Sequence, residues 1–170
     1  MPTAPEFTIR AAHVDDSPAM AAILASSDAL HRDALPWLFR DPGGPSRSRD
    51  DFAALIDDDA AALLVADSAD DGIVGVVHGL LRPAPDFPVF VKESRGVLDG
   101  LVVAPTWRRR GVGRALALAF EQWATARGAA WIELNVYAFN VEAERFYAAL
   151  GYAPLLTRLR KAPPDGSSTA

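Results

Sequence analysis

The chain has 170 residues, half of them apolar and 23% charged, which is the composition of an ordinary globular protein. Its net charge of −5 speaks against general binding to nucleic acid or an anionic membrane surface, and no apolar run approaches the ~20 residues of a membrane-spanning helix. The absence of cysteine excludes disulfides, thiolate–zinc sites and a cysteine nucleophile, and it fits a cytoplasmic protein. We expect one domain over residues 1–160 and a disordered tail over 161–170.

The first third of the chain predicts one strand and two helices. The strand lies around Phe7–Arg10, and a helix follows from Pro18 to about Leu30, where polar cap residues and a proline suit the first turn. Residues 41–50 have the proline, glycine and serine content of a loop. A second, short helix is predicted over Asp50–Asp57.

The middle third predicts a sheet. Two β-branched runs, 63–67 and 73–81, are joined by a polar turn with Asp71-Gly72, which is typical of a hairpin. Three prolines interrupt the pattern between 82 and 88. A long strand is then predicted over Phe90–Ala104, distorted at one of its glycines.

The last third returns to helical spacing. A helix is predicted over Gly111–Arg127, a strand over 131–137, a helix over 141–150 that Gly151 ends, and a final strand over 152–160. Together the elements predict a mixed α/β fold, in which helices flank a mostly antiparallel central sheet. The strand–helix–strand unit in the second half predicts one parallel pair of strands.

The sharpest local signal is a basic glycine turn between the long strand and the next helix. Glycines allow the backbone to approach a bulky anion, and a helix N-terminus offers unpaired amides. The turn lacks the third small residue of a dinucleotide-binding fingerprint, because Leu116 stands there, and it lacks the lysine of a P-loop. A tight turn with solvated arginines is the alternative to an anion site. Four arginines in a net-negative chain favour the anion site: Arg108, Arg109, Arg110 and Arg114.

Two motifs make the sequence resemble the GNAT superfamily of N-acetyltransferases. Residues 108–113, RRRGVG, match the family's Arg/Gln-x-x-Gly-x-Gly/Ala turn. Residues 140–152, NVEAERFYAALGY, are similar to its Asn-x-x-Ala-x-x-Phe-Tyr-x-x-x-Gly-Phe pattern, with Tyr152 in place of phenylalanine. The order of predicted elements agrees with the family over roughly 7–160.

The resemblance implies that the protein binds acetyl-CoA as a cosubstrate. The glycine turn would hold the pyrophosphate, and the strand before it would bind the pantetheine arm and polarise the thioester carbonyl. That strand and the next, over Ile132–Val136, would splay apart to admit the cosubstrate. The residues implied in binding are Leu101, Val102, Val103, Arg108, Arg109, Arg110, Gly111, Val112, Gly113, Arg114, Asn135, Asn140 and Tyr147. Asn140 is also expected to cap its helix.

Two residues are candidates for proton transfer. By resemblance, Tyr147 would protonate the departing thiolate, and a packed aromatic is the alternative. Asp99 would take the proton of the incoming amine, either directly or through a water. Period-two alternation places Val97, Asp99, Leu101 and Val103 on one face, where burial does not explain a carboxylate. A salt-bridged aspartate at a bulge beside Gly100 is the alternative.

The acceptor side is expected in the segment after the first helix, as in the resembling family. His31, Trp37 and Phe39 would form an aromatic wall suited to a cation or an apolar amine, with core packing as the alternative. His78, on a central strand, is interpreted as a core histidine with satisfied hydrogen bonds rather than a base. Three scattered histidines predict no metal site.

These observations predict transfer of an acetyl group to a primary amine, on a small molecule or a peptide, in a ternary complex. Without cysteine no acyl-cysteine intermediate can form, so transfer is expected in one step. The alternative is a GNAT-fold module that binds acyl-CoA without transferring the acyl group, as a sensor or interaction module. No nucleic-acid or membrane partner is expected, and the resemblance allows a homodimer that pairs through the final strand.

Overall fold

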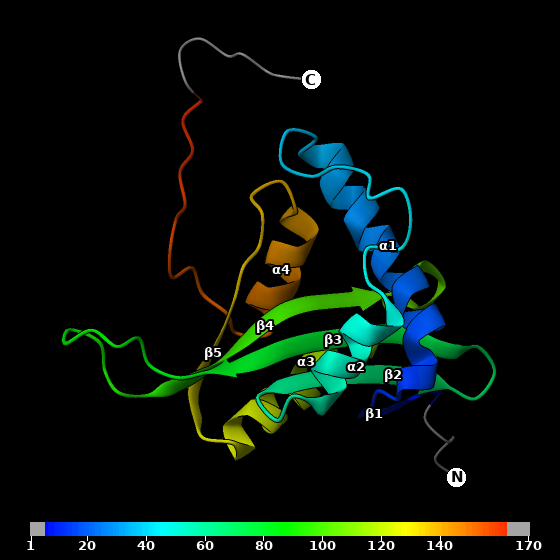
Figure 1. The fold of residues 1–170 in the computed structure, drawn as a ribbon, viewed down its shortest axis with the longest axis horizontal. Coiled ribbons are helices and arrows are strands. Elements are labelled where there is room, and N and C mark those ends of the chain that lie inside the picture. The colour runs from blue at the N-terminus through cyan, green and yellow to red at the C-terminus, as the bar shows by residue number, and fades with distance from the viewer. Residues whose placement is uncertain (1–5, 163–170) are drawn as a thin grey trace. The chain divides into compact units, whose positions relative to one another are not determined.

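A computed structural model describes residues 6–162 of the chain. The chain divides into two compact units, Met1–Asn135 and Val136–Ala170, and each is described by itself (Figure 1). Within the described residues no helix is both long enough and apolar enough to cross a membrane. The predicted tail at 161–170 falls almost entirely outside the described residues, since only 161 and 162 belong to them.

The first unit is built on a five-stranded sheet whose spatial order follows the chain. Neighbouring strands run antiparallel, except that the last two are parallel, so the predicted mostly antiparallel sheet with one parallel pair is confirmed. The strands are β1 (Thr8–Ala11), β2 (Ala61–Ser68), β3 (Gly72–Arg82), β4 (Ser94–Val103) and β5 (Ala129–Leu134).

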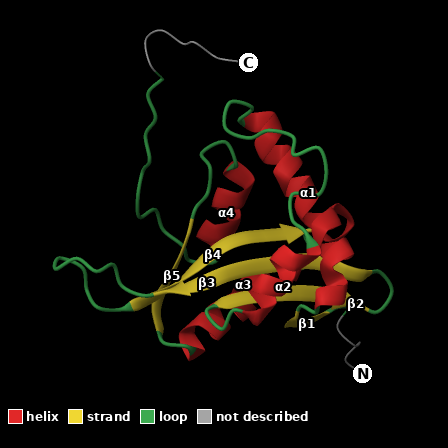
Figure 2. Ribbon diagram, viewed as in Figure 1, coloured by secondary structure: helices red, strands yellow, loops and turns green. Residues whose placement is uncertain are grey.

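Three helices cover the two faces of this sheet (Figure 2). Helices α1 (Ser17–Ala34) and α2 (Arg49–Asp57) lie on one face, and α3 (Val112–Ala126) lies on the other. The core of the first face joins Met20, Leu24 and Phe52 of the two helices to Val65 and Val76 of the sheet. Successive residues of a strand point to opposite faces, so the residues on either side of Val76 face α3.

Helix α3 packs closely because its face of the sheet carries glycine. A Cβ at Gly79 would lie 2.4 Å from the carbonyl oxygen of Val97 and 2.5 Å from the ring of Phe120. No side chain fits at such distances, so glycine at this position sets how near the helix comes to the sheet. Phe120 is fully buried there.

Most predicted elements of the first unit are confirmed, with shifted ends. The first helix runs on to Ala34, and the 63–67 and 73–81 runs form the antiparallel hairpin of β2 and β3. The long strand does not begin at Phe90, because the amide of Phe90 bonds the carbonyl of Phe87 in a turn. The partner strand β3 ends at Arg82, just before the prolines, so the ladder has no partner there.

The second unit contains helix α4 (Val141–Ala149), as predicted. The side chain of Asn140 caps it by accepting a hydrogen bond from the amide of Ala143 at 3.1 Å. Gly151 follows the helix with a φ of 97°, in the left-handed region that favours glycine.

The predicted final strand over 152–160 is wrong. These residues have no regular secondary structure, and Leu155, Leu156 and Leu159 are 80%, 79% and 87% exposed. A strand needs a hydrogen-bonded partner, and the described part of this unit, 136–162, holds no other strand. A homodimer that pairs through this segment stays a prediction.

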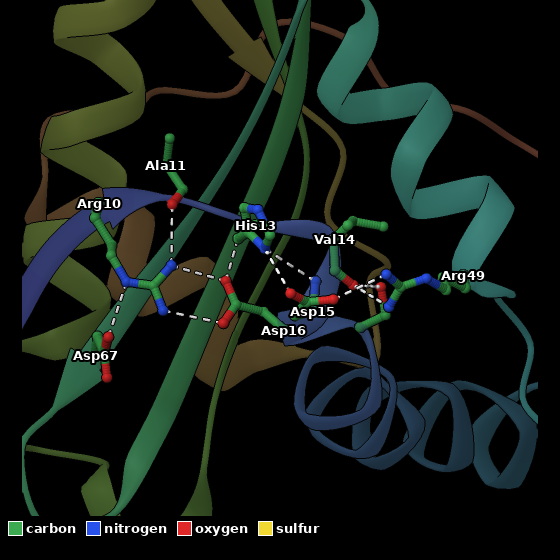
Figure 3. A network of polar contacts seen from close by, with 9 residues as sticks. Arg10, Ala11, His13, Val14, Asp15, Asp16, Arg49 and Asp67 are labelled. Atoms are coloured by element: carbon green, nitrogen blue, oxygen red, sulfur yellow. Dashed lines mark hydrogen bonds and ion pairs between the residues drawn. The ribbon is translucent and has the colours of Figure 1, made fainter.

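A polar network ties β1 and β2 to the short 3₁₀ helix η1 (Val14–Asp16) that precedes α1 (Figure 3). The guanidinium of Arg10 donates to both carboxylate oxygens of Asp16, at 2.7 and 3.0 Å, and to Asp67 at 2.8 Å. Asp16 also accepts from the amide of His13 at 2.7 Å. The hydrogen bonds from Arg10 hold the pKa of the Asp16 carboxyl below its usual value.

We expect Asp16→Asn to lower the free energy of unfolding by about 1–2 kcal/mol at pH 7, the scale of a charge-assisted hydrogen bond that is partly screened by solvent. A carboxyl with a lowered folded pKa stabilises the protein above its ordinary pKa of 3.8 and loses this contribution as the pH falls through the folded value. The difference from wild type in urea unfolding should therefore shrink at pH 3. Asp15→Asn is the control, because that carboxylate is 71% exposed and its loss should matter little. Equal effects of the two substitutions would contradict the assignment.

Candidate functional site

The parallel pairing of β4 and β5 ends before β4 does. It runs from Ser94 opposite Ala129 to Leu98 opposite Leu134, whereas β4 stays paired with β3 as far as Val103. Over 99–103 the backbone groups that face away from β3 therefore have no strand partner among the described residues. A splay of β4 and β5 over residues 132–136 stays a prediction, because residues 132–134 are still paired with β4 and β5 ends at Leu134. Unpaired backbone groups of this kind are available to a ligand.

A β-bulge at Asp99 directly follows Leu98, the last residue of β4 that is paired with β5. Gly79 lies opposite Leu98 and His78 lies opposite Gly100, so Asp99 is an extra residue of β4 without a partner on β3. Bulges bend a strand and increase its twist, which fits a strand that leaves its neighbour here. The carboxylate of Asp99 is on an exposed residue.

The bulge corrects the predicted alternation of β4. Val97 lies opposite Leu80, whereas Leu101 lies opposite Val77, three positions away on β3. Positions an odd number apart on a strand face opposite sides of the sheet, so Val97 and Leu101 do not share a face. Asp99 is therefore no buried carboxylate in an apolar row.

His78 lies on the sheet face covered by α1 and α2, the face of Val76. Its ring packs against Gly100, where a Cβ would come within 2.5 Å of Nε2. The residue is half-buried, and the imidazole forms no hydrogen bond with any of residues 6–162. The interpretation of His78 as a core histidine with satisfied hydrogen bonds is therefore wrong. Burial lowers its pKa, the charge of Asp99 opposes that shift, and the charge of Arg47 adds to it.

Arg47 reaches this region because the loop between α1 and α2 is fastened to α1. Its guanidinium donates to the carboxylate of Asp28 at 3.0 Å, and the hydroxyl of Ser46 donates to the same oxygen. The sequence pattern did not predict that the charges of Asp99 and Arg47 influence the imidazole of His78. The three residues come from β3, a bulge of β4 and a loop, and the proline–glycine composition of 41–50 indicated only the loop.

The predicted acceptor residues lie at the end of α1 and in the loop after it. The rings of His31 and Phe39 are in contact, with centroids 5.4 Å apart, and Nδ1 of His31 is 2.7 Å from the carbonyl oxygen of Ser27. Trp37 is 55% exposed. The structure thus brings His31 and Phe39 together, and Trp37 is presented to solvent nearby in the chain.

The glycine turn links β4 to α3 through the short 3₁₀ helix η2 (Pro105–Trp107). Gly111 stands at the N-cap with a φ of 85°, and Arg109 has a φ of 63°, which is uncommon for a residue with a Cβ. No side chain caps α3, and its first turn holds no acidic residue. The amides of residues 112–114 therefore point out of the helix start without a protein acceptor, as an anion site requires.

The arginines of the turn divide into two pairs. Arg108 donates to the carbonyl of Val103 at 3.3 Å, and Arg110 lies over the ring of Trp107 at 5.0 Å. The other two, Arg109 and Arg114, are exposed and form no ion pair or hydrogen bond within residues 6–162. Trp107 is itself anchored by a hydrogen bond from its indole N–H to Asp71 at 2.9 Å. Two arginines of the turn are thus held by protein contacts, and the other two are available to an anion.

Tyr147 belongs to the second unit and is packed among aromatic rings. Phe146 and Tyr152 lie edge-on to it, with centroids 5.0 and 5.6 Å away. Burial raises the pKa of Tyr147 to about 12, so its phenol keeps its proton at neutral pH. Asn140 caps α4, as expected. The sequence had predicted Asn135 to lie on the strand, but β5 ends one residue before it.

No group of three or more histidine, aspartate or glutamate residues within 6–162 is arranged to hold a metal ion. The groups that this region presents are backbone amides, the arginines of the turn, and the side chains of His78 and Asp99. Amides at an uncapped helix start suit a phosphate, and open strand amides suit a carbonyl oxygen or a peptide-like chain.

Comparisons with known proteins show the family of the chain. The profile of the Acetyltransferase (GNAT) family matches residues 29–152. A mycothiol acetyltransferase of Nocardiopsis dassonvillei is 34% identical over 97 residues, which make up 57% of this chain but only 29% of that protein. The BH1408 protein of Bacillus halodurans, in the structure of a tetramutant, has a TM-score of 0.86 at 26% identity and covers 92% of this chain and 99% of its own. An aminoglycoside N-acetyltransferase in complex with CoA shares the fold, with a TM-score of 0.65 at 19% identity over 97% of this chain and 99% of its own.

We expect Gly111→Ala to lower the free energy of unfolding by about 1–2 kcal/mol, the cost of a Cβ in the left-handed region. Nothing lies within 4 Å of the new Cβ, so the effect would be backbone strain alone. Gly44→Ala is the matched control, because that glycine also has open space but no positive φ. Urea unfolding of both variants measures the difference. A stability equal to that of Gly44→Ala would show that the turn relaxes without cost.

Proposed function

Because the chain belongs to the GNAT acetyltransferase family, as its two motifs predicted, we propose that it transfers an acetyl group from acetyl-CoA to a primary amine. The observation that carries the proposal is the continuous path from the open edge of β4 to the uncapped start of α3. This path supplies unpaired amides in the order that an extended chain ending in a pyrophosphate would need. Acyl transfer is the activity common to the family, and acetyl-CoA as donor and an amine as acceptor are the specific parts of the proposal.

The donor side of the proposal rests on the glycine turn. The pyrophosphate would accept hydrogen bonds from the amides of Val112, Gly113 and Arg114, and the helix dipole favours its charge. Arg109 and Arg114 are available to pair with phosphate oxygens, whereas Arg108 and Arg110 are held by Val103 and Trp107. The CoA complex of the aminoglycoside N-acetyltransferase supports the choice of donor.

The reacting end of acetyl-CoA would lie along Leu101, Val102 and Val103. Amides there that face away from β3 can donate to the pantetheine arm and to the thioester oxygen. As the amine attacks, charge develops on that oxygen, and fixed amide donors stabilise it more strongly than they stabilise the ground state. The open edge of β4 would thus serve both to bind the donor and to lower the barrier.

Two protons must move during the proposed reaction. Asp99, or a water that it orders, is the candidate for taking the proton of the incoming ammonium. Tyr147 is the candidate for protonating the departing thiolate, and a phenol that stays protonated at neutral pH suits a general acid. Transfer would be direct, since the chain has no cysteine to carry the acetyl group.

The acceptor in this proposal is an amine, on a small molecule or a peptide, that approaches on the face of α1 and α2. His31, Phe39 and Trp37 would contribute aromatic surface to its binding. An aminoglycoside acetyltransferase among the similar structures supports a small-molecule amine. A role as an acyl-CoA sensor without transfer is the alternative function.

We expect the wild-type chain to bind acetyl-CoA with micromolar affinity and Gly111→Trp to lose that binding, because the indole would cover the helix amides. Gly128→Trp is the matched control: Gly128 has a similar φ, 89° against 85°, equally open surroundings, and lies at the other end of α3. Isothermal titration calorimetry with acetyl-CoA measures both. No binding by the wild type, or equal loss in both variants, would contradict the donor site.

Tyr147→Phe should lower turnover tenfold or more, the low side of the ~10²–10⁴-fold contributions of general acids. The measurement is the release of CoA thiol with a panel of primary amines: spermidine, tyramine, glucosamine and the aminoglycoside sisomicin. Tyr137→Phe is the control for loss of a phenol elsewhere in the same unit. Unchanged turnover in Tyr147→Phe would remove the acid role, and acetyl-CoA binding without thiol release for any amine would favour the sensor.

A further inference from the structure

We infer that His78 is the group that receives the proton of the acceptor ammonium, and that Asp99 acts as the charge partner of its imidazole. The inference deepens the proposed acetyl transfer and rests on it. It makes His78, which was interpreted from the sequence as a core residue, the proton acceptor in place of the exposed carboxylate of Asp99.

The first support is where the ring lies. His78 is opposite Gly100, the residue directly after the bulge, and the parallel pairing of β4 and β5 ends at Leu98. Its imidazole therefore stands at the start of the open edge of β4, on the face of α1 and α2. Nε2 occupies the space that a side chain at position 100 would take, since a Cβ there would be 2.5 Å away. Glycine at this position keeps the ring in place.

The second support is that the imidazole is free to accept a proton. It has no hydrogen bond to any described residue, and within 6–162 no fully buried side-chain nitrogen or oxygen lacks a partner. The ring nitrogens of this half-buried residue must therefore reach solvent. A neutral imidazole with an accessible nitrogen is a base, and histidine is the side chain whose ordinary pKa lies nearest to neutral pH.

The third support is the charge around the ring. From β4 the carboxylate of Asp99 favours the imidazolium, and from the loop before α2 the guanidinium of Arg47 disfavours it. On β2 the residue opposite is Leu63, which carries no charge. From α1 the carboxylate of Asp28 is already paired with Arg47. Burial is the largest influence and keeps the ring neutral, so the base form is present before the acceptor arrives.

The proposed proton transfer balances. The ammonium of the acceptor gives one proton to the imidazole, and the freed lone pair of nitrogen attacks the thioester carbonyl carbon. The C–N bond forms, the C–S bond breaks, and the thiolate takes a proton from a general acid, for which Tyr147 is the candidate. A second proton leaves the new amide nitrogen and restores the acid through solvent. The proton on His78 is released to solvent, so one proton is produced for each acetyl group transferred.

The first test observes the ring itself. The chain has three histidines, so ring resonances in ¹H–¹³C spectra are assigned by His13→Gln, His31→Gln and His78→Gln. In the full chain, the resonance of His78 should titrate below the ordinary pKa of 6.5. Asp99→Asn should move the midpoint to lower pH, because it removes a negative charge that favours the imidazolium. Arg47→Gln should move it to higher pH, because it removes a positive charge that disfavours the imidazolium. A midpoint that does not change in Asp99→Asn would overturn the role of Asp99 as charge partner without any acceptor being known.

The second test uses turnover with acetyl-CoA and the most active amine of the panel. His78→Gln should lower kcat at least tenfold and remove the acidic limb of the kcat–pH profile, with the Kd of acetyl-CoA within twofold of wild type. Asp99→Asn should keep the limb but move it to lower pH, as a charge partner requires. Gly100→Ala, which retains the histidine but displaces its ring, should also lower kcat. His13→Gln is the control and should match wild type.

The outcomes separate this inference from the proposed function. Wild-type kcat and an unchanged profile in His78→Gln would overturn the role of His78 and leave acetyl transfer intact. If Asp99→Asn removed the acidic limb and His78→Gln did not, the carboxylate would be the base. Failure of the wild type to bind acetyl-CoA would instead overturn the proposed function, and the role of His78 with it.

Discussion

The proposed site depends on one geometric feature, which is that β4 extends beyond the end of its pairing with β5. A continuous parallel pair would satisfy every backbone group of β4 and leave nothing for a ligand. The extra residue at Asp99 falls where that pairing stops, so the strand keeps β3 as its partner on one side and is open on the other. In the proposed site, a ligand would bind to backbone groups that stay unpaired on a strand held in place by the rest of the sheet.

The glycine turn also presents backbone groups without a partner. Strand β4 leads through η2 and the glycine turn to α3, whose first amides are capped by no side chain. Trp107, which is anchored to Asp71, lies on the path between them. Two arginines are used to hold the turn and two remain available. On the other side of the sheet, the network of Arg10, Asp16 and Asp67 fastens the start of α1 to the first strands. These contacts thus hold the elements around a short stretch of backbone whose amides are unpaired.

Sequence patterns were sufficient for the helices, the hairpin and the glycine turn, since each depends on residues close together in the chain. Two predictions failed where pairing with a distant partner decides the outcome. Residues 90–93 were predicted to begin the long strand, but β3 ends at Arg82, before the prolines, and leaves them no partner. Residues 152–160 were predicted to form a final strand, yet the described part of their unit has no strand with which they could pair.

The sequence by itself determined the family, the order of the elements as far as the last helix, and the basic glycine turn, because motifs and periodicity are properties of contiguous residues. Only the tertiary structure decided which side chains meet at the bulge. Period two placed Asp99 in an apolar row, and one extra residue in β4 reversed the faces beyond it. That shift set an exposed carboxylate beside His78, while a loop fastened to Asp28 brought the charge of Arg47 to the same imidazole. A register shift is a relation between two strands, so neither strand's sequence contains it.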